Sequence, residues 1–407
     1  MSRSRALRVC GVLGLALACS DDTAGTGETG TETGDSQAPL DPCDPGPSSV
    51  ERPELDWRVD YDQPGSEIIN DLALRPGGGV VGVGQAMGSV LALELDASGE
   101  ELWRVGPFAG IQSNAVRVVL DDQGNSYIAG TVVGALEGQE AGGESDLFMA
   151  ALGPAGELLW VRQWGSPGDE FTSDMTMGAP GQLLVTGNTD AAFAGEHLGS
   201  RDGYVVEVDT QGELQWQLQW GTPEFDWPRA IAANCEGEFV VAGSRYDIQG
   251  IPGAFVERFD SSGEQLWSRG IQGPANQIFA DVALLDDVVY AVGSVTEMDD
   301  FNNSSAGLAA AYSTAGSKLW DQEVGVTTLN KIISAGDGLI IGKDEARLER
   351  LETDGSWGWT YTVQPTANLS AITSVERAPD GSLYVASLDA KAADRNAMIA
   401  RLLPAAP

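Results

Sequence analysis

The sequence predicts an all-β fold, a seven-bladed β-propeller of four-stranded antiparallel blades in which the N-terminal strand completes the last blade. Two spacings predict it. In the first, a glycine precedes a tryptophan by four residues six times, and a seventh tryptophan, Trp57, precedes the series without a glycine. A repeat of about 40 to 55 residues built from short strands is typical of propellers. The six pairs are Gly99/Trp103, Gly156/Trp160, Gly212/Trp216, Gly263/Trp267, Gly316/Trp320 and Gly355/Trp359.

The fourth repeat displays the unit most clearly. Its short runs rich in β-branched and aromatic residues alternate with turns of Asp, Ser and Gly, which is the pattern of antiparallel hairpins. The expected strands are 229–234, 238–243, 254–259 and 264–269. We interpret the Asp-x-x-Gly segments at Asp96, Asp209 and Asp260 as turns rather than calcium loops, because they lack the further oxygen ligands of such loops.

In the second spacing, a turn glycine precedes another glycine by six residues. We expect the first glycine to supply a positive φ in the hairpin and the second to allow close approach of two backbones. The pairs are Gly78/Gly84, Gly124/Gly130, Gly181/Gly187, Gly237/Gly243 and Gly336/Gly342, with Asp287/Gly293 and Gly381/Ser387 as substituted copies.

The two ends of the chain complete one blade. The seventh repeat stops after its third strand, near 398–403, and lacks the Gly-x-x-x-Trp strand. Residues 54–60 carry the unpaired Trp57. We therefore expect this segment to be the missing strand and to protect the edges of the last blade. The six paired tryptophans are expected to pack between blades.

The repeat resembles the bacterial SBBP-type β-propeller repeat. The resemblance is carried by residues 237–243 and 260–267 and their counterparts, and it covers nearly all of 54–407. The Gly-x-x-x-Trp element also resembles the tryptophan-docking motif of quinoprotein propellers and of outer-membrane assembly lipoproteins. Both resemblances imply a propeller, and the first implies a repeat lipoprotein.

The N-terminal segment predicts export and a lipid anchor. Arg3, Arg5 and Arg8 precede a short apolar run that ends in Ala16-Leu17-Ala18-Cys19, which resembles a bacterial lipobox. We expect a lipoprotein signal peptide at 1–18, lipidation of Cys19, and a disordered tether rich in Thr, Gly, Glu and Pro over 19–53. The alternative is an ordinary signal peptide with an incidental cysteine. The propeller is expected to span 54–407.

The net charge and the cysteine content limit the classes of binding partner and of bound metal that we expect. The formal net charge of −37 argues against nucleic acid and against an anionic membrane surface, so we expect membrane contact through the lipid anchor alone. Cys43 and Cys235 could form a disulfide in an exported protein. No spacing of Cys and His indicates zinc, and no cofactor is expected apart from Ca²⁺ as an option at acidic loops.

The loops between the second and third strands are the candidate ligand or cation face, because long loops on a rigid scaffold are where function tends to lie. The acidic candidates are Glu137, Glu140, Glu144, Asp146, Asp190, Glu196, Asp299 and Asp300. A solvated acidic surface is the alternative. Trp164, Trp220 and Trp227 lie near the crossings between blades, where we expect core packing, with exposure to a ligand as the alternative.

These features favour a monomeric, non-catalytic binding or scaffolding module at the bacterial cell envelope, at the outer membrane or cell surface, with a protein or glycan partner. Two alternatives stay open. One is a carbohydrate-active hydrolase or lyase that uses carboxylates of the loop-bearing face. The other is a divalent-cation-dependent adhesion protein. The only histidine, His197, has no partner spacing that predicts a catalytic triad or a metal site.

Overall fold

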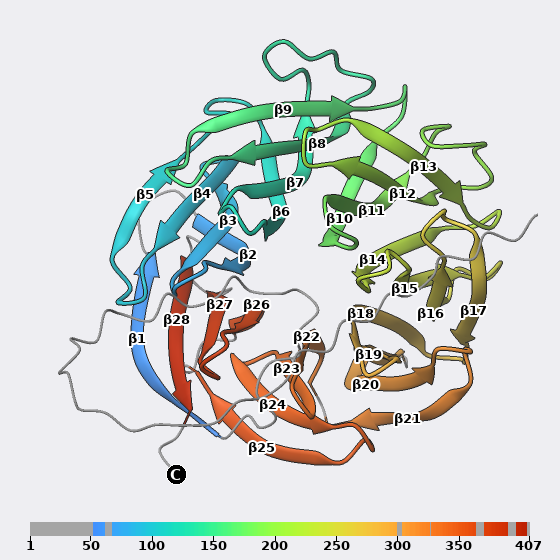
Figure 1. Ribbon diagram of the computed structural model, residues 1–407. Coiled ribbons are helices and arrows are strands. Elements are labelled where there is room, and N and C mark those ends of the chain that lie inside the picture. The colour runs from blue at the N-terminus through green and yellow to red at the C-terminus, as the bar shows by residue number, and fades with distance from the viewer. Residues whose placement is uncertain are drawn as a thin grey trace, which may run out of the picture. The chain divides into compact units, whose positions relative to one another are not determined.

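The computed structural model describes residues 52–61, 67–298, 303–325, 327–363, 370–389 and 396–404, which belong to one compact unit, 37–407. These residues form seven antiparallel sheets of four strands each. The sheets are arranged as blades around a common centre (Figure 1). The predicted seven-bladed propeller is confirmed.

The strands are β1 (Pro53–Tyr61), β2 (Glu67–Leu74), β3 (Val80–Ala86), β4 (Ser89–Leu95), β5 (Glu101–Val105), β6 (Ser113–Leu120), β7 (Ser126–Val133), β8 (Ser145–Leu152), β9 (Leu158–Trp164), β10 (Glu170–Met177), β11 (Gln182–Thr189), β12 (Asp202–Asp209), β13 (Leu214–Trp220) and β14 (Asp226–Ala233). They continue with β15 (Phe239–Tyr246), β16 (Pro252–Phe259), β17 (Gln265–Ile271), β18 (Asn276–Leu285), β19 (Val288–Met298), β20 (Asn303–Ser313), β21 (Lys318–Val324), β22 (Leu329–Ala335), β23 (Gly338–Lys343), β24 (Arg347–Glu352), β25 (Trp357–Thr362), β26 (Ser370–Arg377), β27 (Leu383–Asp389) and β28 (Asn396–Pro404).

Blades 1 to 6 each use four consecutive strands, from β2–β5 to β22–β25, whereas blade 7 joins both ends of the chain in the order β1-β28-β27-β26. β1 runs antiparallel to β28, from Pro53 opposite Pro404 to Tyr61 opposite Ala397. Figure 1 shows the two strands side by side. The predicted closure by the N-terminal strand is therefore confirmed.

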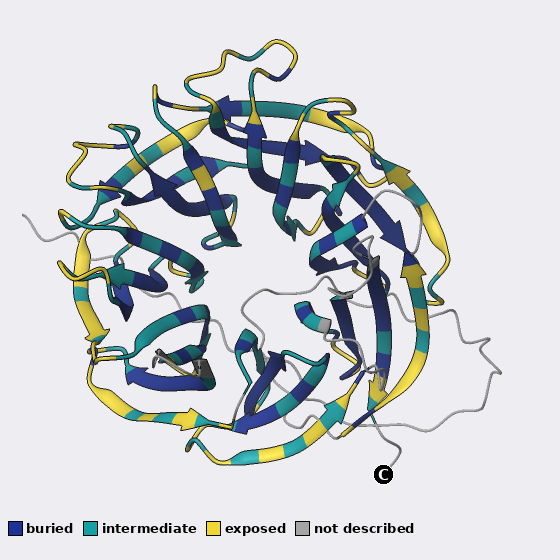
Figure 2. Cartoon of the chain, turned by 180° about the vertical axis from the view of Figure 1, so that it is seen from behind, coloured by how far each residue is buried: buried dark blue, intermediate teal, exposed yellow. Residues whose placement is uncertain are grey.

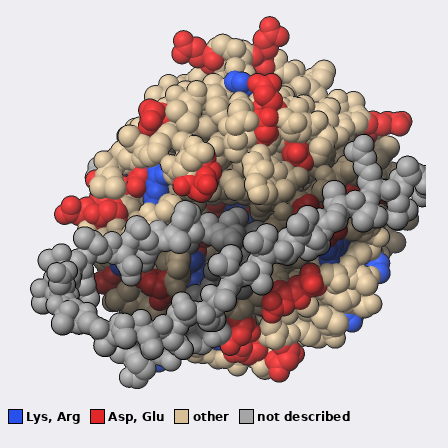
Figure 3. All heavy atoms as spheres, in the orientation of Figure 1, with Lys and Arg blue, Asp and Glu red and all other residues tan. Residues whose placement is uncertain are grey.

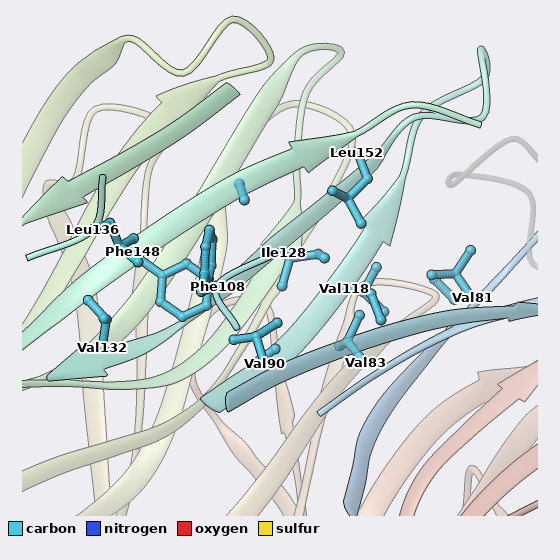
Figure 4. Close-up of a cluster of buried hydrophobic side chains, with 14 residues drawn as sticks. Val81, Val83, Val90, Phe108, Val118, Ile128, Val132, Leu136, Phe148 and Leu152 are labelled. Carbon is cyan, nitrogen blue, oxygen red and sulfur yellow. The ribbon is translucent and has the colours of Figure 1, made fainter. Parts of the chain in front are cut away.

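The core consists of seven apolar clusters, one at each junction between neighbouring blades. At the junction of blades 1 and 2, Val83 and Val90 meet Phe108, Ile128 and Phe148 (Figure 4). Exposed residues concentrate in the outermost strands and in the loops (Figure 2). Within the described ranges, no helix is long and apolar enough to cross a membrane.

The paired tryptophans pack between blades, as expected, but Trp57 and the paired tryptophans before Trp359 contact the glycine of the next motif and not their own. A Cβ added at Gly156 would lie 2.9 Å from the indole of Trp103, and one at Gly212 would lie 3.0 Å from that of Trp160. Trp160 Nε1 also donates to the carbonyl of Thr210 at 3.0 Å. The Gly-x-x-x-Trp spacing therefore encodes contacts to both neighbouring blades.

The spacing of six residues between two glycines has the two causes expected from the sequence, a positive φ at the first glycine and a close backbone approach at the second. The turn glycines adopt positive φ, for example +80° at Gly124 and +83° at Gly237, and Asp287 adopts +62° in the same place. At Gly84 an added Cβ would lie 1.9 Å from the carbonyl oxygen of Ile68. These second glycines lie opposite a bulge that recurs in every innermost strand, such as the register shift between Ile69 and Asp71. The bulge matters for the site because it redirects the following side chains.

Candidate functional site

A pocket of about 630 Å³ opens where the innermost strands of blades 3, 4 and 5 meet. We call it the channel-mouth pocket. It lies within the size range of small-molecule sites, about 300 to 1,000 Å³. Three aromatic rings, two arginines and several small polar side chains line it: Phe171, Thr172, Ser173, Asn188, Arg201, Phe225, Trp227, Arg229 and Ala280.

Arg229 is the most unusual of these residues. Its guanidinium lies 4.1 Å from the centre of the Trp227 ring. Its Nε–H is buried without an acceptor, and no carboxylate of the described residues forms an ion pair with it. Burial lowers the pKa of Arg229 from its usual value. An arginine remains protonated in proteins, so the fold holds a poorly solvated positive charge at this point.

The local fold explains why Arg229 faces the pocket. In the pairing of β14 with β15, the register passes from Pro228/Gly243 directly to Ala230/Ala242 and leaves Arg229 as the bulged residue. A bulge turns its side chain away from the regular alternation of the strand. The equivalent residues in blades 3 and 5, Ser173 and Ala280, also line the pocket.

Arg201 forms the opposite wall of the pocket. Its guanidinium lies 4.6 Å from the ring centre of Phe171, which is 37% exposed. Arg201 donates to Asn188 Oδ1 at 2.9 Å and lies 3.4 Å from Asp190 Oδ2. Arg201 therefore has polar partners within the fold, whereas the partners of Arg229 among the described residues are the ring of Trp227 and the nearby hydroxyl of Tyr246.

The crossings that carry these residues are held by buried carboxylates. Glu170 accepts from the backbone N–H of Ser166 at 2.8 Å, and in the next blade Asp226 accepts from that of Thr222 at 2.6 Å. Burial raises the pKa of Glu170, although its bonds to Ser166 oppose this. Both carboxylates thus brace the start of an innermost strand, next to Phe171 and Trp227.

A charged cluster lies on the innermost strands β2, β6, β10 and β18, at the positions that follow the bulges. Arg117 contacts Asp174, lies 2.9 Å from Asp71 Oδ1 and lies 3.7 Å from Asp281 Oδ1. Burial opposes the charge of Arg117, but the three carboxylates outweigh it and hold its pKa well above the usual value. The cluster joins four blades across the centre of the ring.

Each aspartate of this cluster also ties its blade to the next. Asp71 accepts from the N–H of Val118 at 3.0 Å, and Asp174 accepts from that of Ile231 at 2.8 Å. Glu376 on β26 faces the same cluster. Burial, followed by the charge of Asp71, raises the pKa of Glu376 to about 8. These carboxylates are thus engaged in holding the blades together.

Two of the predicted acidic candidates have partners inside the fold. Asp146 is buried and accepts from Gly142 N at 2.9 Å and Gln163 Nε2 at 2.6 Å, so it shapes its own loop. Asp190 accepts from Asp169 N at 2.8 Å and lies beside Arg201, which brings it next to the channel-mouth pocket.

The other acidic candidates are not brought together at this pocket. Glu137, Glu140, Glu144 and Glu196 are exposed. Asp299 and Asp300 lie outside the described residues. Among the residues that the structure describes, no group of three or more His, Cys, Asp or Glu side chains is arranged to hold a metal ion. Acidic side chains outnumber basic ones on the face drawn in Figure 3.

The three tryptophans of the crossings divide between packing and the pocket. Trp164 packs against the apolar cluster of blades 2 and 3, and Trp220 packs edge-on to Phe259 at 5.4 Å. Trp227 instead lines the pocket. The Asp-x-x-Gly segments are turns, as expected, since Asp209 Oδ1 accepts from the N–H groups of Gln211 and Glu213, both at 2.9 Å.

Sequence reasoning missed Arg201, Arg229 and the cluster around Arg117. A signal for the cluster was available, because Asp71, Asp174 and Asp281 occupy equivalent positions in their repeats. Cys235 is disulfide-bonded. Cys10, Cys19 and Cys43 lie outside the described residues, so the pairing of Cys235 with Cys43 stays a prediction, as does lipidation of Cys19.

No family model matches the chain. The chain is 26% identical over 160 residues to the regulatory protein FlaEY of Caulobacter vibrioides, a match that covers 35% of this chain and 17% of that protein. The chain thus spans less than a fifth of that relative.

Two solved propellers illustrate the similarity of fold. The WD40 domain of Neurospora crassa Pan2 is 9% identical, with a TM-score of 0.57 over 88% of this chain and 98% of that one. The quinohemoprotein alcohol dehydrogenase of Comamonas testosteroni is 12% identical, with a TM-score of 0.52 over 87% of this chain and 77% of that one. At these identities the likeness concerns the fold alone.

Proposed function

We propose that this chain is an exported, lipid-anchored binding protein of the bacterial cell envelope, and that its propeller presents the channel-mouth pocket to a ligand. One observation carries the binding function. Arg229 keeps a largely buried positive charge without a carboxylate partner, stacked on Trp227 in a pocket that can hold a small molecule or a glycan unit. Such a charge is unfavourable for the free fold, and a ligand that pairs with it offsets the cost.

The rigid scaffold supports the same proposal. The pocket walls come from three blades, and the apolar clusters at the blade junctions fix their relative positions. Asp174 of blade 3 adds a hydrogen bond, because it accepts from the N–H of Ile231 in blade 4. A site preorganised in this way loses little entropy when a ligand binds. The leader sequence and Cys19 support the location, and the net charge of −37 supports a role that does not involve nucleic acid.

The binding function is tested by capture from envelope extracts with the wild-type chain and with Trp227→Ala. We expect a component that the wild type retains, that Trp227→Ala loses, and that Arg162→Gln still retains. Arg162 is a control outside the pocket, because it lies over the ring of Trp160 at 5.9 Å on the outermost strand of blade 2 and pairs with Glu213 at 3.2 Å. Equal capture by all three proteins would refute the pocket as the binding site. A chelator arm tests the cation-dependent alternative.

The anchor is tested separately with Cys19→Ser. The wild type should remain in the membrane fraction and enter the detergent phase, and the variant should be released, because one acyl-carrying cysteine is the only anchor that the sequence predicts. Release of the wild type to the same extent would contradict lipid anchoring and would leave the pocket unaffected.

A further inference from the structure

The channel-mouth pocket also specifies a class of ligand, an inference that rests on the proposed binding function. The buried or partly buried guanidiniums of Arg75, Arg117 and Arg245 each contact at least one carboxylate of the fold. Arg229 lies over the face of Trp227 and forms no ion pair with a carboxylate of the described residues. A stacked guanidinium still has its N–H groups directed outward in its plane, where they match the two oxygens of a carboxylate or a phosphate.

The surrounding charges favour an anion of low charge. Asp190 lies 3.4 Å from Arg201 and partly offsets the charge of that arginine at the wall of the pocket. Acidic residues outnumber basic ones 60 to 23 in the whole chain. A dianionic phosphate group is therefore repelled more strongly than a carboxylate with a single charge, whereas both can form the same paired hydrogen bonds with Arg229.

The walls favour a ring attached to that carboxylate. Phe171, Phe225 and Trp227 provide apolar surface, and Ser173 and Asn188 add hydrogen-bonding groups at the edge. Phe225 and Trp227 lie 5.7 Å apart with their ring planes inclined by 58°, so they form a corner rather than a flat shelf. A ring of a sugar or an aromatic acid fits such a corner with its carboxylate toward Arg229.

We infer that the channel-mouth pocket binds a carboxylate carried on a ring, with Arg229 as the residue that pairs with the carboxylate and Trp227 as the wall against the ring. Two sources share this chemistry. One is a uronic-acid unit of an acidic glycan, and the other is a small aromatic carboxylic acid.

The inference predicts opposite effects of one substitution on stability and on binding. Arg229→Gln removes a partly buried charge without breaking an ion pair, so the free variant should fold and should melt at the same temperature as the wild type or higher. The affinity for a ring carboxylate should fall at least about tenfold, because a hydrogen-bonded charge pair is lost. Arg162→Gln should change neither property in this direction.

The test is titration calorimetry at low salt with four probes: trigalacturonate, its methyl ester, 4-hydroxybenzoate and inorganic phosphate. We expect wild-type binding of trigalacturonate or of 4-hydroxybenzoate, which identifies the source. We also expect much weaker binding of the methyl ester and of phosphate, and loss of carboxylate binding in Arg229→Gln.

Three outcomes would overturn the inference: no binding of either carboxylate at millimolar concentration, tighter binding of phosphate or of the ester, or equal affinity of Arg229→Gln and wild type. The binding function fails separately. If Trp227→Ala abolishes capture from envelope extracts but Arg229→Gln does not, the pocket remains a binding site and only the anionic class is wrong.

Discussion

Replacing a turn glycine by alanine separates backbone strain from tryptophan docking between blades. Gly156 and Gly181 are a matched pair, because their φ angles are +81° and +82°. At Gly181 an added Cβ meets nothing within 4 Å, whereas at Gly156 it would lie 2.9 Å from the indole of Trp103. Gly181→Ala therefore reports strain alone, and Gly156→Ala reports strain together with displacement of Trp103.

The expected magnitudes follow from these contacts. A left-handed conformation costs alanine about 1 kcal/mol or somewhat more, and this is the whole expected loss at Gly181. At Gly156 the displaced indole also weakens the bonds that Trp103 Nε1 donates to Glu94 Oε2 at 2.6 Å and to the carbonyl of Pro154 at 3.1 Å, for about 1 kcal/mol together. Re-exposure of roughly 50 Å² of apolar surface adds about 1 kcal/mol. The total for Gly156→Ala is then about 3 kcal/mol.

The assay is urea unfolding followed by circular dichroism, with both variants measured in the wild-type and in the Trp103→Ala background. In the second background, Gly156→Ala should cost no more than Gly181→Ala, because no indole remains to be displaced. Equal losses for the two glycines in the wild-type background would refute tryptophan docking as a source of stability at this junction.

Three further outcomes are expected. Glu376, neutral in the fold up to about pH 8, is ionised in the unfolded chain above about pH 4.5, so the free energy of unfolding should fall as the pH rises between these values. Glu376→Gln should abolish this fall. The variant should be roughly 2–4 kcal/mol more stable than wild type at pH 9 and no more stable at pH 4. A difference in melting temperature that does not change with pH would contradict the raised pKa of Glu376. Arg117→Met should lower the free energy of unfolding by about 3–5 kcal/mol at pH 7, because it leaves buried carboxylates without their cation, and a loss below about 1 kcal/mol in urea denaturation would contradict this role. Deleting 1–61 should expose the edge of β28 and yield dimers or aggregates in light scattering, whereas an unchanged monomer of wild-type melting temperature would show that β1 does not protect that edge.

The repeat features were predictable because they depend on short stretches of chain. A positive φ at Gly124 and a close backbone approach at Gly84 each leave a local requirement for glycine that recurs once per blade. The unpaired Trp57 and the missing fourth strand of the last repeat were sufficient to predict the closure. The sequence could not show that a tryptophan docks on the glycine of the following motif and not on its own, since both assignments give the same spacing.

The candidate site was less predictable. The acidic loops were predicted to form the ligand or cation face because of their composition. Asp146, however, is buried and accepts a hydrogen bond within its own loop. Arg201 and Arg229 carry no spacing that distinguishes them from arginines on the surface. Arg229 differs only because a bulge directs it into the pocket and because no carboxylate of the described residues lies beside it.

By itself the sequence determined the number of blades, the strand order within them and the way in which the two ends meet. These features depend on glycine, tryptophan and apolar residues that recur once per blade at fixed spacings. Only the tertiary structure decided which side chains share the channel mouth. Phe171, Arg201 and Arg229 belong to blades 3 and 4, and Arg117 of blade 2 meets aspartates of blades 1, 3 and 5. Their convergence depends on the angle between blades and on the direction of each side chain at a bulge, and neither leaves a periodic trace in the sequence.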